Sequence, residues 1–268
     1  MRKLFIVFTT MALTVAFHAT SFAATPVDLT SWSDLTLDLG GGQSAGNWVL
    51  SNANTTATQT INADPSFFLN NLNQTSYSID GSWLVLPGTG DDDFMGFVFG
   101  FSGPNQTYVF DWKAANQSLS PYGDALEGFS IKKINAPDVA DLVLADFWDK
   151  DGTTHTTILD SNWSTTNGWV AGKTYDFHLD FDPGVISIVV KDGATELWNT
   201  TVNDNMYTAG QFGFYNFSQA SVQYSGFEQT GGVIVPPGGG SGVVPEPASM
   251  LLFGGGLLGS VISRRRKK

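Results

Sequence analysis

Apolar and polar residues alternate over short segments of this chain, and no segment between Asp28 and Gln229 has convincing helical periodicity. The clearest example places apolar side chains on one face and polar ones on the other: Tyr175, Phe177, Leu179 and Phe181 against Asp176, His178, Asp180 and Asp182. Because successive side chains of a strand point to opposite faces, this pattern predicts a sheet with one buried face. The turn residues Asp182-Pro183-Gly184 then lead into Val185 to Lys191, which predicts a hairpin.

Further strands are expected along the whole middle of the chain, separated by Asn, Asp, Gly and Pro. They are Asn47–Ser51, Thr58–Asn62, Tyr77–Leu86, Asp93–Phe101, Thr107–Lys113, Gly128–Ile134, Leu142–Phe147, His155–Leu159, Glu196–Val202, Gln211–Phe217 and Ser221–Phe227. In the segment 93–101 the alternation puts Met95, Phe97, Phe99 and Phe101 on one face. About a dozen strands in about 200 residues predict an all-β fold, a single large β-sandwich.

The charge of the chain is strongly acidic away from its ends. The full sequence has a formal net charge of −12 and no cysteine, which excludes disulfide scaffolds, cysteine-ligated metal sites and thiol catalysis. Between residues 24 and 244 there are 24 acidic residues against six lysines, a net charge of −18. A body this acidic repels nucleic acid and anionic membranes, whereas abundant Asp suits turns and calcium.

The N-terminus has the composition of a secretory signal. Arg2 and Lys3 precede an apolar run from Leu4 to Phe17, and small residues at Ser21 and Ala23 predict cleavage after Ala23. We therefore expect a signal peptide at residues 1–23. An uncleaved membrane anchor is the alternative.

The C-terminus combines a short motif, an apolar segment and a basic end. Pro245, Glu246 and Pro247 precede the apolar run Ala248–Ile262, and Arg264–Lys268 follow it. As a helix this run measures about 22 Å, shorter than the hydrocarbon core of about 30 Å. The arrangement resembles the PEP-CTERM sorting signal of Gram-negative bacteria, which implies processing by exosortase after a transient inner-membrane stage. A simple tail anchor is the alternative.

Residues 231–244, which are rich in Gly and Pro, are expected to be a linker. Residues 245–268 are expected to be the sorting signal with its transmembrane segment.

The body between these ends, 24–230, resembles the C-terminal domain of thrombospondins. The resemblance rests on Asn47–Leu50, Gln59–Pro65, Gly90–Phe101, Thr107–Lys113, Gly168-Trp169 and Gln211–Gln219, with 91–101 its most specific part. It implies a jelly-roll sandwich of the legume-lectin (concanavalin-like) type, calcium binding and adhesion at cell surfaces. The disulfide and the preceding calcium-binding repeats of animal members are missing here. Some animal members bind a receptor through the segment that matches 107–113. We do not expect that receptor to be a partner of this chain.

Two acidic segments are candidate metal sites. Asp91, Asp92 and Asp93 stand together, and their mutual repulsion would be relieved by a hard cation. Strand geometry predicts that Asp91 and Asp93 converge while Asp92 points away; a solvated loop is the alternative. Asp149 and Asp151, followed by Gly152, have the spacing found in the first half of many calcium loops. A plain hairpin turn is the alternative there.

The sequence offers no recognised catalytic pattern. It contains neither a Gly-x-Ser-x-Gly motif nor the Glu-x-Asp-x-x-Glu strand of sandwich glycosidases. His178 lies between carboxylates, but one strand alone supplies no convergence, so an exposed polar face is expected. Trp163, in the Asn- and Thr-rich stretch 161–168, is expected to be exposed and able to stack on a sugar, whereas Trp169 is expected to be buried.

The resulting hypothesis is a non-enzymatic, calcium-stabilised lectin-like protein, exported to the outer envelope, cell surface or extracellular matrix. Its expected role is adhesion or association with exopolysaccharide, and its expected partners are an exosortase-type enzyme and a glycan. A polysaccharide-active enzyme and a purely structural matrix component are the alternatives.

Overall fold

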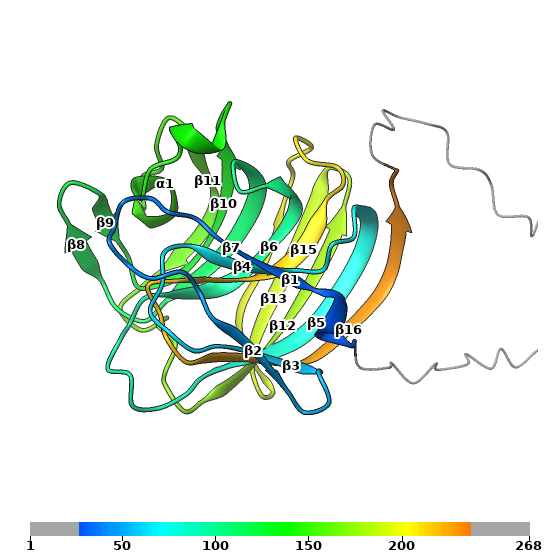
Figure 1. Cartoon of the computed structure of the whole chain (residues 1–268), viewed down its shortest axis with the longest axis horizontal. Coiled ribbons are helices and arrows are strands. Elements are labelled where there is room, and N and C mark those ends of the chain that lie inside the picture. The colour runs from blue at the N-terminus through cyan, green and yellow to red at the C-terminus, as the bar shows by residue number, and fades with distance from the viewer. Residues whose placement is uncertain (1–26, 237–268) are drawn as a thin grey trace, which may run out of the picture.

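Two seven-stranded antiparallel sheets form the protein, which we describe from a computed structural model over residues 27–236 (Figure 1). The first sheet consists, in spatial order, of β1 (Ser33–Thr36), β4 (Ser66–Leu69), β15 (Gln211–Phe217), β6 (Phe94–Gly103), β7 (Gln106–Lys113), β10 (Gly128–Asn135) and β11 (Thr156–Trp163). The second consists of β14 (Thr195–Val202), β13 (Val185–Asp192), β12 (Thr174–Asp182), β5 (Gln74–Val85), β16 (Val222–Ile234), β3 (Thr56–Gln59) and β2 (Trp48–Ser51). The predicted β-sandwich is confirmed.

Short elements complete the chain outside the two sheets. They are the two-stranded sheet of β8 (Gln117–Leu119) and β9 (Gly123–Ala125), the helix α1 (Ala145–Trp148), and the 3-10 turns η1 (Leu29–Ser31) and η2 (Val139–Asp141). Within residues 27–236 no helix has the length and apolar character needed to cross a membrane.

Aromatic side chains from both sheets fill the space between them. Trp83 on β5 stacks on Phe177 of β12 at 4.7 Å and on Phe110 of β7 at 5.6 Å between ring centroids. Phe97 on β6 stacks on Phe110 at 4.7 Å. Such offset ring pairs add stabilisation to the large area that each ring buries. The alternating aromatic residues of the sequence thus build the main core.

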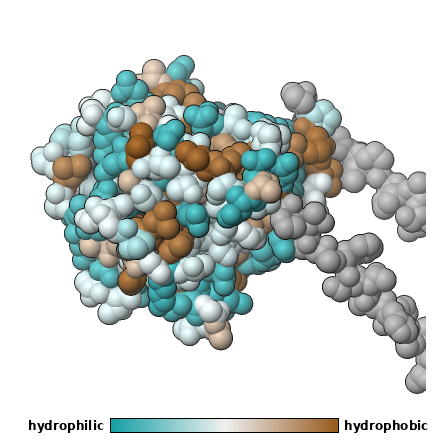
Figure 2. All heavy atoms as spheres, turned by 60° about the horizontal axis from the view of Figure 1, so that its bottom comes forward, coloured by the Kyte–Doolittle hydropathy of each residue, from teal (hydrophilic) through white to brown (hydrophobic). Residues whose placement is uncertain are grey.

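The first sheet is buried on its other face as well. A second apolar cluster there joins Phe94 and Val98 of β6 and Tyr215 of β15 to Phe147 and Trp148 of α1. The second sheet instead presents a polar outer face, since the even-numbered residues of β12 are exposed or half-buried while the odd-numbered residues from Tyr175 to Phe181 are buried, as predicted. Figure 2 shows a surface on which hydrophilic residues surround small apolar groups. The two sheets therefore differ in what they offer to a ligand.

Two strand expectations are wrong. Leu142–Phe147 is not a strand, because the chain there forms α1, whose Phe147 and Trp148 cover the first sheet. Phe101 does not share a face with Phe97, because a register shift after Phe99 and a positive φ of 56° at Gly100 interrupt the alternation. Only glycine adopts that backbone region without strain.

The expected addresses at the two ends lie outside the described residues. These are the signal peptide 1–23 with its cleavage after Ala23, and the sorting signal 245–268. The expected linker 231–244 is described only in its first part, where β16 continues through Gly231 and Gly232. Gly231 lies opposite Tyr77, and Ile234 lies opposite Gln74. The second sheet therefore extends four residues beyond the domain boundary expected at 230.

Candidate functional site

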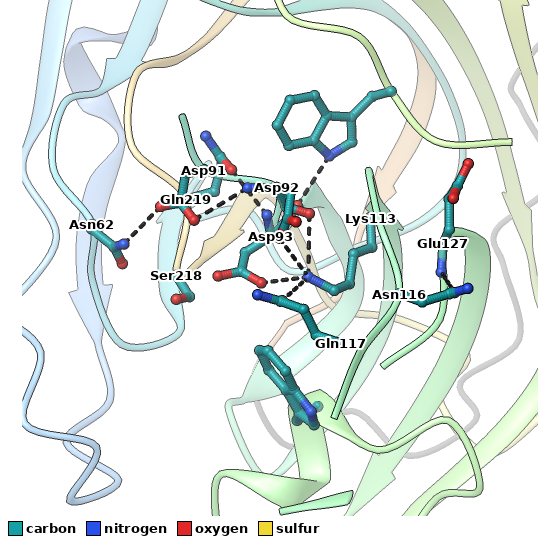
Figure 3. A network of polar contacts seen from close by, with 12 residues as sticks. Asn62, Asp91, Asp92, Asp93, Lys113, Asn116, Gln117, Glu127, Ser218 and Gln219 are labelled. Carbon is teal, nitrogen blue, oxygen red and sulfur yellow. Dashed lines mark hydrogen bonds and ion pairs between the residues drawn. The ribbon is translucent and has the colours of Figure 1, made fainter. Parts of the chain in front are cut away.

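Asp91, Asp92 and Asp93 form an acidic cluster directly before β6 (Figure 3). Each offers one carboxylate oxygen, and these oxygens lie within 4.8 Å of one another. The expectation that Asp92 points away is wrong, because the three residues precede the strand and do not follow its alternation. Among residues 27–236 this is the one group of three carboxylates, imidazoles or thiols arranged to hold a metal ion.

A buried lysine lies against this cluster. Lys113, the last residue of β7, is fully buried, and its Nζ donates to Asp93 Oδ1 at 2.5 Å and to Asp92 Oδ1 at 3.3 Å. It also donates to Gln117 and lies 5.1 Å from the ring centroid of Trp148. One ammonium against three carboxylates leaves a charge of −2 when all three are ionised, which matches a divalent cation. Nothing in the sequence pattern pointed to this lysine as a partner of the cluster, although it lies in the segment 107–113 that resembles the family.

Three residues from distant parts of the chain fix the cluster. Gln219 Oε1 accepts a hydrogen bond from the backbone N–H of Asp93 at 3.0 Å, and Trp169 Nε1 donates to the Asp93 carbonyl at 3.0 Å. Asn62 Nδ2 donates to Asp91 Oδ2 at 2.7 Å. Figure 3 shows Asn62 and Gln219 reaching the cluster. The carboxylates are therefore held in place before any ligand binds.

The electrostatics of the cluster disfavour full ionisation. Burial, followed by the charge of Asp93, raises the pKa of Asp91 to about 6. A hard cation coordinated by carboxylate oxygens would relieve both effects, and calcium and magnesium prefer such ligands. The donor set fits a cation held mainly through Asp91 and the oxygens of Asp92 and Asp93 that Lys113 leaves available.

Asp149 and Asp151 lie in a different place and do not join the cluster. They belong to the turn that follows α1, where Asp149 Oδ1 accepts a hydrogen bond from the backbone N–H of Asp151 at 3.1 Å. The Asp151 side chain is 76% exposed and pairs with Lys150 at 2.5 Å. This geometry is that of a solvated turn.

The two tryptophans of the segment 161–169 differ in burial. Trp169 is buried, as expected, and its indole N–H links the core to the acidic cluster. Trp163 ends β11 opposite Gly128 and is half-buried, so part of its surface faces solvent. Its role as a sugar contact stays a prediction.

Comparison with known proteins places this architecture in a family. The thrombospondin C-terminal region matches residues 43–231, more than half of the chain. The chain belongs to the thrombospondin C-terminal region family. The PEP-CTERM protein-sorting motif matches residues 243–267, on the C-terminal side of this domain. Both resemblances read from the sequence are thus confirmed.

The relatives are much longer proteins. The thrombospondin C-terminal region of this chain is 28% identical to thrombospondin-2 of Bos taurus over 189 residues, covering 67% of this chain and 16% of that protein. It is 27% identical to thrombospondin-3b of Danio rerio over 214 residues, covering 76% of this chain and 23% of that protein. The chain therefore spans less than a quarter of the length of either relative.

Among solved structures, the fold is similar to the carbohydrate binding module CBM66 from Bacillus subtilis, with a TM-score of 0.48 and 11% identity over 75% of this chain and 96% of that one. It is also similar to the exoplasmic/lumenal domain of VIP36 in its Ca²⁺/Man3GlcNAc-bound form. There the TM-score is 0.49 and the identity 9%, over 85% of this chain and 91% of that one.

A second polar group lies on the outer face of the second sheet of this thrombospondin C-terminal region. His178 Nδ1 lies 2.8 Å from Asp80 Oδ1 on β5, and its Nε2 lies 3.1 Å from Asp180 Oδ2 on β12. The expectation that no second strand brings a side chain to His178 is therefore wrong, because Asp80 of β5 does so. Burial lowers the pKa of His178, but hydrogen bonds to Asp80 and Asp180 outweigh it and raise the pKa overall. The group is a bridge between two strands, with both imidazole nitrogens engaged by carboxylates.

Proposed function

We propose that this protein is an exported, non-enzymatic binding module, stabilised by calcium at the acidic cluster, that associates with glycans of the cell surface or extracellular matrix. The observation that carries the proposal is the fixed cluster of Asp91, Asp92 and Asp93 with its residual charge of −2 beside Lys113. Membership in the thrombospondin C-terminal region family and the adjoining sorting motif support an adhesive role outside the cell.

The cation is tested by thermal unfolding of the body in calcium, in magnesium and in chelator. A cation that binds only the folded state at about a hundredfold excess over Kd adds about 2.7 kcal/mol, or about 5–10 °C for a domain of this size. We expect this rise with calcium, and we expect Asp91→Asn to abolish it. Asp151→Asn is the matched control, because it removes a carboxylate from the solvated turn and leaves the cluster intact.

Two outcomes of this titration would contradict a specific calcium site at the acidic cluster. One is an equal rise with magnesium, which would indicate general charge screening. The other is a calcium shift that survives in Asp91→Asn and disappears in Asp151→Asn, which would move the site to the turn after α1.

An enzyme acting on polysaccharide is a second candidate, favoured by one observation. A carboxyl group whose pKa is raised to about 6, as at Asp91, has the property of a general acid that works near neutral pH. Incubation with a panel of polysaccharides, followed by analysis of reducing ends, separates the two functions. The binding module leaves the glycans intact, whereas turnover that is lost in Asp91→Asn supports the enzyme.

Export and sorting complete the proposal. The sorting motif at 243–267 implies recognition by an exosortase-type enzyme and delivery to the outer envelope, the cell surface or the matrix. The transient inner-membrane stage is carried by the apolar run Ala248–Ile262 and the basic end that follows it.

A further inference from the structure

A small pocket lies next to the acidic cluster, on the side of Trp148. Its volume is about 210 Å³, and its walls include Gly41, Gln43, Leu119, Tyr122, Trp148 and Ser218. One contact and one chain connection join it to the cluster. Trp148 lies under the Lys113 ammonium, and Ser218 directly precedes Gln219, which holds the Asp93 backbone. Figure 3 shows Ser218 on the side of Asp93 that faces away from Lys113. The pocket and the cluster are therefore neighbouring parts of one surface.

Two oxygens in and behind this wall lack a hydrogen-bond donor. One N–H of Gln43 Nε2 donates to Ser218 Oγ at 2.9 Å, and Trp148 Nε1 donates to the Gly123 carbonyl at 3.2 Å. Gln43 Oε1 is buried and accepts no hydrogen bond from the described residues. A buried acceptor without a donor costs free energy, which a ligand that brings hydroxyl or N–H groups would recover.

A buried carboxylate behind the pocket supplies the second acceptor without a donor. Asp64 is 3% exposed, and its Oδ1 has no hydrogen-bond partner among residues 27–236. This oxygen lies 2.9 Å from the point where a Cβ on Gly41 would stand, so only glycine fits that wall without displacing a neighbour. The absence of a side chain at Gly41 leaves Asp64 close to the pocket wall.

The rest of the wall is apolar and partly aromatic. Tyr122 and the 42% exposed Leu119 offer surfaces on which the C–H face of a sugar ring can pack, and the buried Trp148 closes the wall behind them. Pockets for drug-sized ligands enclose about 300–1,000 Å³, so a pocket of about 210 Å³ suits a single ring. The pocket combines acceptors that lack donors with an apolar wall. A sugar ring fits both, because it carries hydroxyl donors at its edge and C–H groups on its face.

We propose that this pocket is the glycan subsite of the protein and that it takes one ring of an uncharged hexose or an amino sugar. The inference rests on the proposed glycan binding and gives it a location and a ligand class. An uncharged or amino sugar is favoured over a uronic acid, because a carboxylate would come close to the unpaired oxygens of Gln43 and Asp64 within a body of net charge −18. The site also differs from the stretch 161–168, where Trp163 offers the competing surface.

The test measures binding of the full-length protein, in calcium, to immobilised neutral glucan, mannan, polyglucosamine and polygalacturonate. The pocket variants are Gln43→Leu, Tyr122→Ala and Leu119→Glu. The last alters only an exposed rim residue and keeps the test open if the others fail to fold. Trp163→Ala is the matched aromatic control outside the pocket. We expect each pocket variant to weaken binding to a neutral or amino-sugar polymer at least about tenfold with an unchanged melting temperature, while Trp163→Ala binds like the unaltered chain.

Three results overturn the inference while leaving the proposed function standing. They are full binding by Leu119→Glu and the folded pocket variants, loss of binding in Trp163→Ala alone, and preference for polygalacturonate over every uncharged or amino-sugar polymer. If the unaltered chain binds none of the polymers, the proposed glycan binding itself fails, and the subsite fails with it. The calcium titration tests the cation site, and its outcome does not depend on any of these glycan-binding results.

Discussion

Asp91 carries a carboxyl group whose charge is opposed both by burial and by the neighbouring Asp93. Its pKa is raised to about 6, against an ordinary value of 3.8, so the folded chain holds this proton more tightly than the unfolded chain does. Without a divalent cation, the stabilisation from the protonated form is therefore lost as the pH rises from about 4 to about 6. We expect a melting curve series in chelator to show this loss, and Asp91→Asn to remove its share of the slope.

The same series in calcium supplies the control. A bound cation favours the ionised carboxylate, so the slope between pH 4 and 6 decreases when calcium is present. An identical slope for the unaltered chain and Asp91→Asn in chelator would contradict the assignment of this titration to Asp91.

Trp169 and Trp163 provide a matched pair of aromatic residues close in sequence. Trp169 is buried and donates to the Asp93 carbonyl, so Trp169→Ala leaves a cavity and removes a support of the cluster. We expect it to cost about 3–5 kcal/mol of unfolding free energy and to weaken the calcium response. Trp163→Ala, at a half-buried strand end, is expected to cost clearly less. Equal losses in chemical denaturation would show that the two side chains are equally part of the core.

At the scale of elements, the His178 bridge couples β5 to β12. Because its pKa is raised in the folded state, the stabilisation by the charged imidazole is fully present below the unfolded pKa of about 6.5 and is lost as the pH rises through the folded value. We expect His178→Gln to lower the melting temperature at pH 5.5 and to have little effect at pH 9. Asp80→Asn, which removes the partner on β5, is expected to reproduce this pattern. A deficit that is constant with pH would indicate a packing effect instead.

Local alternation predicted the strands well where a strand keeps its pleat and has one polar face. The β12–β13 hairpin follows the alternation of its residues throughout. Alternation failed at Gly100, where a bulge exchanges the two faces of β6. It also failed at 142–147, because a six-residue segment with five apolar residues fits a short covering helix as well as a strand. The choice between helix and strand depends on the second buried face of the first sheet, which exists only once the sheet has formed and packed.

The candidate site was predictable in part. The acidic run 91–93 was visible as a possible cation site, and the structure brings its carboxylates together. The buried partner Lys113 and the support from Gln219 were not visible, because they lie 20 and 126 residues from Asp93 in sequence and meet it only when β7 and the turn after β15 are in place. The unpaired acceptor at Gln43 depends on which hydrogen bonds the fold leaves unmade, so no pattern of residue types could show it.

At the scale of the whole molecule, the proposed function assigns binding to the domain and delivery to the sorting motif. β16 ends at Ile234 and the motif match begins at residue 243, so about eight residues separate the sandwich from the segment that directs processing. Removal of the segment would leave both sheets, the acidic cluster and the pocket complete. We therefore expect the exported protein to keep its calcium response and its glycan binding after processing.

Processing itself can be tested on secreted material by mass spectrometry of the intact protein. We expect a mature N-terminus at Ala24 and the loss of the basic end Arg264–Lys268, because both ends have the features of removable membrane addresses. Replacing Pro245, Glu246 and Pro247 together by alanine keeps the apolar run and the basic end, so it isolates the motif. This variant is expected to stay membrane-associated with its basic end intact. Recovery of the unaltered chain outside the cell with Arg264–Lys268 still attached would contradict processing at the motif.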